Sequence, residues 1–144
     1  MEYEPEFVKS FMRRTSAIIE EYKGPHDATT LVHCLLGLLV VPKQSLLHKI
    51  PDDPFDTLSS WGIEPSSITN FGQCDYGHEH EPTLRQLVRR LRNAVAHFDI
   101  DPIHSDGVVS GFRFNDRKGF RAEIPLSELR DFSIRLAKYL EENA

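Results

Sequence analysis

Long apolar runs, a surplus of positive charge and regularly spaced cysteines are all missing from this sequence of 144 residues. The longest apolar run, residues 35–41, contains a glycine and is too short to span a bilayer, so we expect no membrane segment. The net charge of -5 is the opposite of what a protein that coats nucleic acid needs, and any such contact must therefore be local. The sequence has two cysteines and no signal-peptide pattern, so we expect a reduced, cytoplasmic protein.

What the sequence does contain is helical periodicity over most of its length. Apolar residues recur at intervals of three and four in residues 4–22, 27–41 and 82–98, and again after Pro125. The second of these segments is apolar on nearly all sides, which predicts the most buried helix. Pro82 suits the first position of the third helix, because a proline there removes no intrahelical hydrogen bond.

A change of period marks the segment before the last helix. Residues 108–114 and 119–124 alternate between apolar and polar, and polar residues 115–118 separate them, which predicts a β-hairpin. The predicted fold class is therefore mainly α: a helical bundle, forming one domain over residues 1–144, with a small hairpin inserted before the C-terminal helix. We expect the hairpin to cap the bundle, and contact with RNA or with a second protomer is the alternative.

The segment 43–81 is rich in proline and in polar residues. It predicts short helices near residues 44–49 and 55–61 and an exposed loop from about 70 to 81. In this loop Cys74, His78 and His80 are of metal-binding type, but their spacing is not that of a standard zinc site. We favour an exposed polar loop and no metal, with zinc ligation as the alternative.

The helix predicted over residues 82–98 carries four arginines and no acidic residue. At about 100° per residue, Arg92, Asn93 and His97 share one surface away from the apolar side. Arg85 and Arg89 lie next to Arg92. The apolar side consists of Leu84, Leu87, Val88, Leu91, Val95 and Phe98. Arginines without carboxylate partners form either a solvated helix face or a site for an anion such as phosphate, which guanidinium groups bind through two hydrogen bonds.

Residues 92–97, Arg-Asn-Ala-Val-Ala-His, resemble the signature of the HEPN superfamily. That signature is an arginine, a polar residue directly after it and a histidine four to six residues beyond the arginine. The resemblance covers the two N-terminal helices, the motif helix and the C-terminal helix, and it is to a compact prokaryotic branch carried on plasmids and mobile elements. It implies a metal-independent endoribonuclease without a cofactor, in which two motif helices of a homodimer line one cleft.

The resemblance also assigns roles to individual residues. The catalytic candidates are Arg92, Asn93 and His97, and the candidates for RNA binding around them are Arg85, Arg89 and Arg90. RNA carries its own nucleophile, the 2′-hydroxyl, so the enzyme needs a base, an acid and a cation for the charge on the phosphoryl oxygens. Histidine exchanges protons near neutral pH, and a symmetric dimer supplies two copies of it. The expected products carry a 2′,3′-cyclic phosphate and a 5′-hydroxyl.

One position departs from the pattern of some HEPN toxins, which carry a tyrosine two residues after the histidine. Asp99 stands there, so modification of that tyrosine by a nucleotidyltransferase is not expected. The predicted role is that of a toxin or defence effector, with an antitoxin or another neutralising protein as partner. The alternatives are a non-catalytic HEPN-type module that binds RNA or nucleotides or only dimerises, and an inert helical domain within a larger complex.

Overall fold

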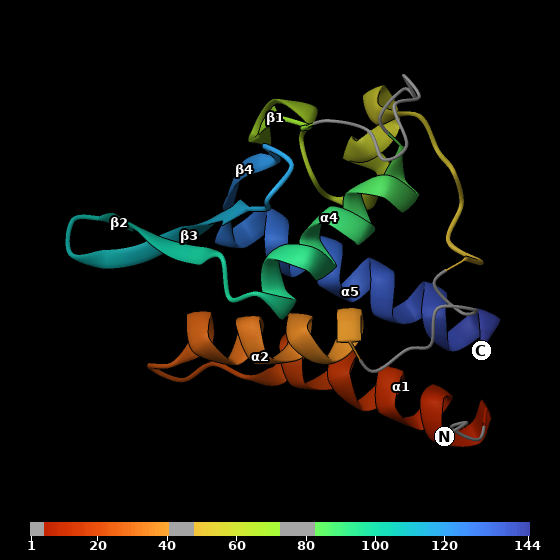
Figure 1. Cartoon of the computed structure of the whole chain (residues 1–144). Coiled ribbons are helices and arrows are strands. Elements are labelled where there is room, and N and C mark those ends of the chain that lie inside the picture. The colour runs from red at the N-terminus through yellow and green to blue at the C-terminus, as the bar shows by residue number, and fades with distance from the viewer. Residues whose placement is uncertain (1–4, 41–47, 73–82) are drawn as a thin grey trace.

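The computed structural model describes residues 5–40, 48–72 and 83–144, and within these ranges helices lie side by side next to a small sheet (Figure 1). The elements in chain order are α1 (Pro5–Glu21), α2 (Asp27–Val40), the 3-10 helices η1 (Phe55–Trp61) and η2 (Pro65–Ser67), β1 (Ile68–Asn70), α4 (Leu84–Ala96), β2 (Ile100–Ser105), β3 (Val108–Asn115), β4 (Arg121–Pro125) and α5 (Leu126–Asn143).

The four helices with strong apolar periodicity are confirmed, with bounds within about two residues of the prediction. Thr83 caps the N-terminus of α4, since its hydroxyl oxygen accepts a hydrogen bond from the backbone N–H of Gln86 at 3.3 Å. Pro82, the predicted first residue, lies outside the described residues. α2 packs between α1 and α4, yet Leu36 and Val40 on its outer side are 43% and 45% exposed. α4 has seven buried residues of 13 and α2 only five of 14, so the prediction that α2 is the most buried helix is wrong.

The predicted mainly α bundle is also wrong, because the chain is mixed α/β with a four-stranded antiparallel sheet in the order β1-β4-β3-β2. The predicted hairpin is confirmed as β3 and β4, which pair from Gly111 opposite Pro125 to Asn115 opposite Arg121. β2 was not predicted because its residues show no regular alternation and include Pro102, which disfavours a central strand. As an edge strand it tolerates proline, and β1 is too short to give a pattern.

The core lies between the helices and the inner face of the sheet. Alternating residues of β3 and β4 are buried and pack with the apolar stripes of α4 and α5; they are Phe112, Phe114, Ala122 and Ile124. The turn between β2 and β3 projects away from the helices, and Val108 there is 67% exposed. The sheet thus packs against α4 through β3 and against α5 through β3 and β4.

The segment between α2 and α4 is described in part. η1 confirms the short helix predicted over residues 55–61, as a 3-10 helix that ends at Gly62 with a left-handed φ of 91°. Most of the helix predicted at 44–49 and of the loop predicted at 70–81 lies outside the described residues. Over the described ranges, every helix is too short or too polar to cross a membrane.

Candidate active site

α4 presents a buried side to the core and an opposite side to solvent. Its buried apolar residues are Leu84, Leu87, Val88, Leu91, Ala94 and Val95. On the other side Arg85 and Arg89 are exposed, Arg92 and Asn93 are partly exposed, and His97 is exposed. The structure therefore confirms the two-sided character of this helix and brings the three predicted catalytic residues to its C-terminal end.

His97 occupies the residue that ends α4, with φ -96° and ψ 2°. Its backbone N–H donates to the carbonyl oxygen of Asn93 at 3.1 Å, which fixes the residue one turn from Asn93. Within the described ranges no hydrogen bond or ion pair involves the imidazole ring, and the residue is exposed. An imidazole in this position is accessible for proton transfer to a bound ligand.

Phe98 follows His97 in a left-handed conformation, with φ 56°. Its N–H donates to the carbonyl of Val95 at 3.1 Å, and the N–H of Asp99 donates to the carbonyl of Ala94 at 2.8 Å. These two bonds form a Schellman motif, which ends a helix with a left-handed residue. Because α4 ends at Ala96, the ring of Phe98 leaves the buried stripe and is 79% exposed, so its predicted place on the apolar side is wrong.

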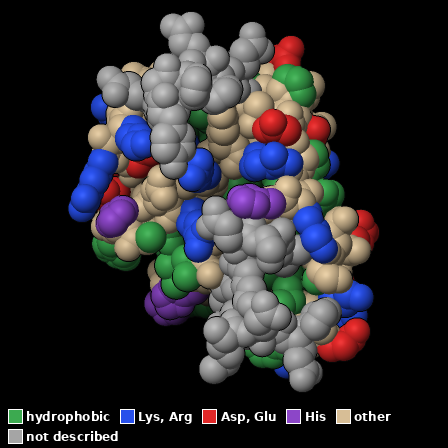
Figure 2. Space-filling view, turned by 45° about the vertical axis from the view of Figure 1, so that its right-hand side comes forward, with side chains coloured by type: hydrophobic (Ala, Val, Ile, Leu, Met, Phe, Trp, Pro, Cys, Tyr) green, Lys and Arg blue, Asp and Glu red, His purple; other side chains and the backbone are tan. Residues whose placement is uncertain are grey.

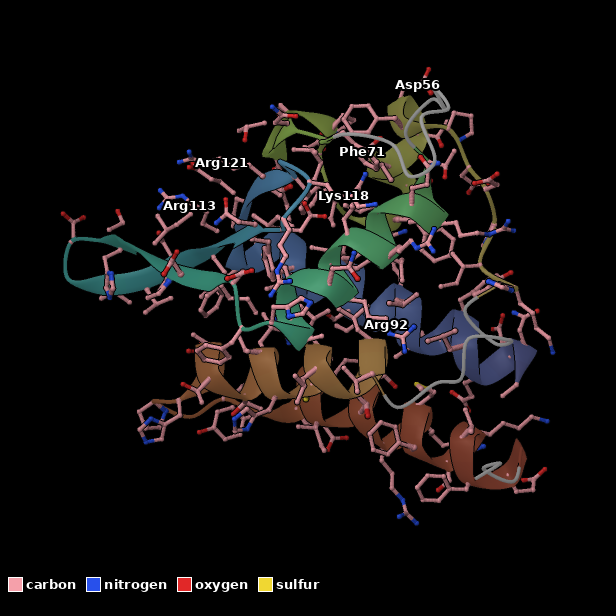
Figure 3. The ribbon with its side chains drawn as sticks, in the orientation of Figure 1. Asp56, Phe71, Arg92, Arg113, Lys118 and Arg121 are labelled. Carbon is pink, nitrogen blue, oxygen red and sulfur yellow. The ribbon has the colours of Figure 1, made fainter. Side chains whose placement is uncertain are left out.

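The remaining arginines predicted to bind RNA differ in their surroundings. Arg85 is exposed, and its Nε donates to the carbonyl of Ile50 at 3.0 Å, which connects the first turn of α4 to the preceding segment. Arg89 is exposed one turn further along. Arg92 lies toward the C-terminal part of the helix (Figure 3). Arg85, Arg89 and Arg92 thus follow one side of α4 from its first turn toward His97.

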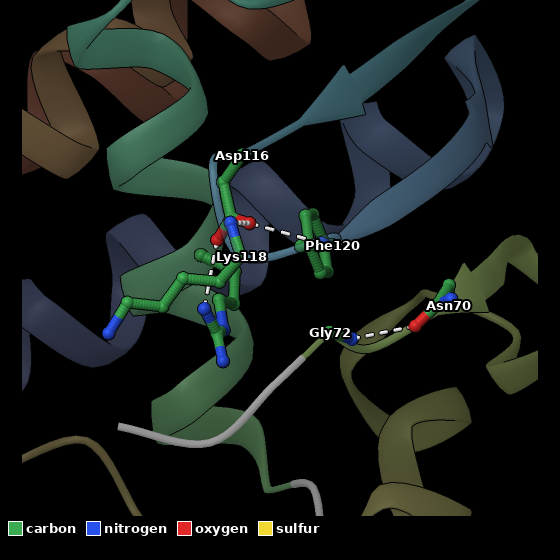
Figure 4. A network of polar contacts seen from close by, with 6 residues as sticks. Asn70, Gly72, Asp116, Lys118 and Phe120 are labelled. Carbon is green, nitrogen blue, oxygen red and sulfur yellow. Dashed lines mark hydrogen bonds and ion pairs between the residues drawn. The ribbon is translucent and has the colours of Figure 1, made fainter. Parts of the chain in front are cut away.

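Arg90 belongs to a different environment. Its guanidinium forms an ion pair with Asp116 at 3.0 Å, and the two side chains are only 6% and 4% exposed. Oδ1 of Asp116 also accepts the backbone N–H groups of Lys118 and Phe120, at 2.8 and 3.0 Å (Figure 4). The Arg90 guanidinium carbon lies 6.0 Å from the ring centre of Phe71, a cation–π distance.

This network connects α4 to the turn between β3 and β4. The charge of Arg90 is compensated inside the protein, so the geometry favours a structural role for it over RNA binding. Sequence reasoning missed Asp116 as its partner. The available signal was an aspartate at the start of a polar turn that ends in a glycine, where such a side chain commonly accepts backbone N–H groups.

The cations of the sheet are also compensated. Nε of Arg113 and an Nη of Arg121 donate to one oxygen of Glu123, at 3.1 and 3.3 Å. The hydrogen bond from Arg113 holds the pKa of the Glu123 carboxyl below its usual value, and Arg121 adds to the effect. α4 itself contains no acidic residue. Lys, Arg and His side chains gather across the middle of one face of the molecule (Figure 2).

The described residues contain no group of three or more His, Cys, Asp or Glu side chains that suits a metal ion. Cys74, His78 and His80 lie outside the described residues, so zinc ligation by them stays an untested alternative. Cys34 is described, and its thiol is buried in the core, which raises its pKa. A buried thiol with a raised pKa is a poor nucleophile, and Cys34 is therefore not a candidate catalytic residue.

The Arg-Asn-x-x-x-His sequence lies at the end of α4, which packs against α2 and β3. A family model described as HEPN pEK499 p136 matches residues 1–144, and the chain belongs to this plasmid-type HEPN family. No curated protein and no solved structure matches the chain. Membership indicates a ribonuclease or a nucleotide-related module, and HEPN domains commonly dimerise.

Proposed function

We propose that the protein is a metal-independent endoribonuclease that acts as a homodimer, and that it serves as a toxin or defence effector. The observation that carries the proposal is the exposed position of His97 at the end of α4, five residues after Arg92 in the Arg-Asn-x-x-x-His sequence. Family membership supports the same reading. A neutralising partner fits a toxin, and the exposed end of α4 is the surface such a partner would need to cover.

The proposed reaction uses the substrate's own 2′-hydroxyl. His97 of one protomer removes the proton from the 2′-oxygen, which attacks the adjacent phosphorus. The bond from phosphorus to the 5′-oxygen breaks, and the partner's His97 gives a proton to the leaving oxygen. Arg92 stabilises the negative charge on the phosphoryl oxygens, and Asn93 orients the imidazole or binds a phosphoryl oxygen. One chain supplies one motif histidine, so the separate base and acid require the dimer.

A second candidate function is a non-catalytic module that binds RNA or nucleotides. One observation favours it: Asp99 is exposed two residues after His97. An exposed carboxylate close to the candidate site opposes the approach of phosphate. In this case RNA binds the arginine side of α4 and is released unchanged.

The first experiment incubates end-labelled RNA with the purified protein in EDTA, beside a DNA strand of the same sequence. We expect cleavage of RNA, no cleavage of DNA, and products with a cyclic phosphate end. His97→Ala is expected to lower the rate roughly 100- to 10,000-fold, the usual contribution of a general acid or base. His26→Ala, which removes another exposed histidine at the start of α2, is the matched control and should cleave at the wild-type rate.

Light scattering at the assay concentration tests the dimer. RNA that is bound equally by wild type and His97→Ala but cleaved by neither would support the binding module and contradict the enzyme. Equal cleavage by both proteins would remove His97 from the mechanism. A monomer that cleaves RNA would contradict the two-histidine scheme.

A further inference from the structure

The residue directly after His97 is held in a conformation that its side chain disfavours. Phe98 has φ 56° at the left-handed position of the Schellman motif that ends α4. Glycine is usual at this position, and a bulky residue with positive φ is an outlier. At the turn between β2 and β3, the described positions with positive φ are Asp106 and Gly107, both of residue types that tolerate it.

The ring of Phe98 makes no buried contact that would offset this strain. It is 79% exposed, the largest exposed fraction among the large apolar side chains that the structure describes. The apolar contact that often accompanies a Schellman motif is made by the residue after the left-handed one, here Asp99, so the motif does not require the ring of Phe98. The fold alone would favour glycine at this position, so an aromatic side chain has its use outside the folded chain.

We infer that Phe98 is a stacking surface for a nucleobase of single-stranded RNA, next to the phosphate that His97 and Arg92 act on. The inference rests on the proposed function and adds a substrate class to it. Single-stranded RNA offers unstacked bases, and aromatic side chains bind them by stacking. In a duplex the bases are already stacked on their neighbours, so double-stranded RNA is a poor substrate.

The surroundings of Phe98 favour a nucleobase over a second protein. The residues on either side of it in the chain, His97 and Asp99, are exposed and polar and add no apolar surface beside the ring, whereas a stable protein contact needs an extended area. One ring is sufficient for one base. The exposed carboxylate of Asp99 repels a phosphate but not a neutral base, and the arginines on the other side of His97 attract the phosphate. The charges around the site therefore fix the orientation of the RNA, with the base at Phe98 and the phosphate at Arg92.

The test replaces Phe98 by glycine, the residue that the backbone prefers. Phe98→Gly should melt at the wild-type temperature or a few degrees above it, because strain is removed and no buried contact is lost. Affinity for a labelled single-stranded RNA 12-mer, measured by anisotropy in the His97→Ala background, should fall about 10-fold or more, as expected for the loss of one stacked base. Phe98→Tyr should keep the affinity. Asp106→Gly is the matched control, because it relieves a positive φ far from His97 and should leave binding unchanged.

Cleavage of the same 12-mer alone and annealed to its complement completes the test. We expect wild type to cleave the single strand and to spare the duplex. If wild type cleaves RNA and Phe98→Gly binds and cleaves it equally well, the stacking role is wrong and the nuclease stands. If wild type cleaves nothing while His97→Ala binds the 12-mer through Phe98, the nuclease is wrong and the stacking surface stands. Loss of the dimer in Phe98→Gly would assign the ring to a second copy of the chain and overturn the inference.

Discussion

Arg90 and Arg92 lie two positions apart on α4, and the molecule uses them in opposite ways. Arg90 points to the side covered by the sheet, where Asp116 and the ring of Phe71 compensate its charge in a buried setting. Arg92 is partly exposed. The same side-chain chemistry is therefore buried in an ion pair in one case, and in the other it is partly exposed to solvent, where we propose that it binds phosphate. What separates the two roles is burial, which is set by the elements that cover each side of the helix.

The strongest test of this difference between the two arginines is to remove the guanidinium of Arg90. Arg90→Ala leaves Asp116 buried without its ion-pair partner, and we expect the free energy of unfolding to fall by about 3–5 kcal/mol. The turn between β3 and β4 should loosen with it, because Asp116 also organises that turn. Urea denaturation followed by circular dichroism measures the loss.

Arg92→Ala is the matched control for this prediction. It removes the same group two residues away and should cost about 1 kcal/mol or less, because charge contacts at partly exposed sites contribute little. Its RNA cleavage should nevertheless fall by about 100-fold, through loss of charge stabilisation at the phosphate. Equal stability losses for the two variants would show that burial does not separate the two arginines.

A smaller loss of stability is expected at the N-terminus of α4. Thr83→Ala removes the side-chain cap of α4 and should lower the free energy of unfolding by about 1 kcal/mol. The cap stabilises the whole helix, including both the buried side with Arg90 and the exposed side with Arg92. Stability and RNA cleavage should therefore decline together, and only slightly. Thermal melts of Thr83→Ala and of Thr29→Ala, an exposed threonine in the first turn of α2, give the measurement and its control. A loss of stability in Thr83→Ala equal to that in Arg90→Ala would contradict the prediction that the buried ion pair contributes more than the helix cap.

The smallest effect is expected from the exposed ion pairs of the sheet. The folded pKa of Glu123 lies below its ordinary value of 4.5, so its contacts with Arg113 and Arg121 stabilise the protein above pH 4.5. This stabilisation is lost as the pH falls through the lowered folded pKa. Melting temperatures between pH 6 and pH 3 should therefore decline slightly more in wild type than in Glu123→Gln. A larger decline in Glu123→Gln would reverse the sign of the linkage.

The helices and the division of α4 into a buried side and a polar side were predictable because apolar spacing along one segment contains that information. The sheet was harder to predict from the sequence. β2 is an exposed edge strand with a proline. It belongs to the sheet because it pairs with β3, and its own sequence has no alternation of apolar and polar residues that would predict a strand. The residues that alternate clearly, in β3 and β4, were predicted correctly as a hairpin.

The assignment of Arg90 shows the same limit at the level of one side chain. On the helix it falls near the border between the apolar side and the polar side, where sequence alone does not say what covers it. Its partner Asp116 is separated from it by 26 positions and becomes its neighbour only when the sheet folds onto α4. Phe98 was misplaced for a related reason, since the prediction continued the helix two residues beyond its end.

The order of the sheet also affects how two copies of the chain meet. β2 forms one edge, and Pro102 within it has no backbone amide hydrogen to offer a further strand. The opposite edge, β1, is three residues long. Neither border is a good template for extending the sheet into a neighbouring molecule, which protects the protein from strand-to-strand aggregation. A homodimer of the kind we propose therefore has the helical surfaces, and not the sheet edges, available for its interface.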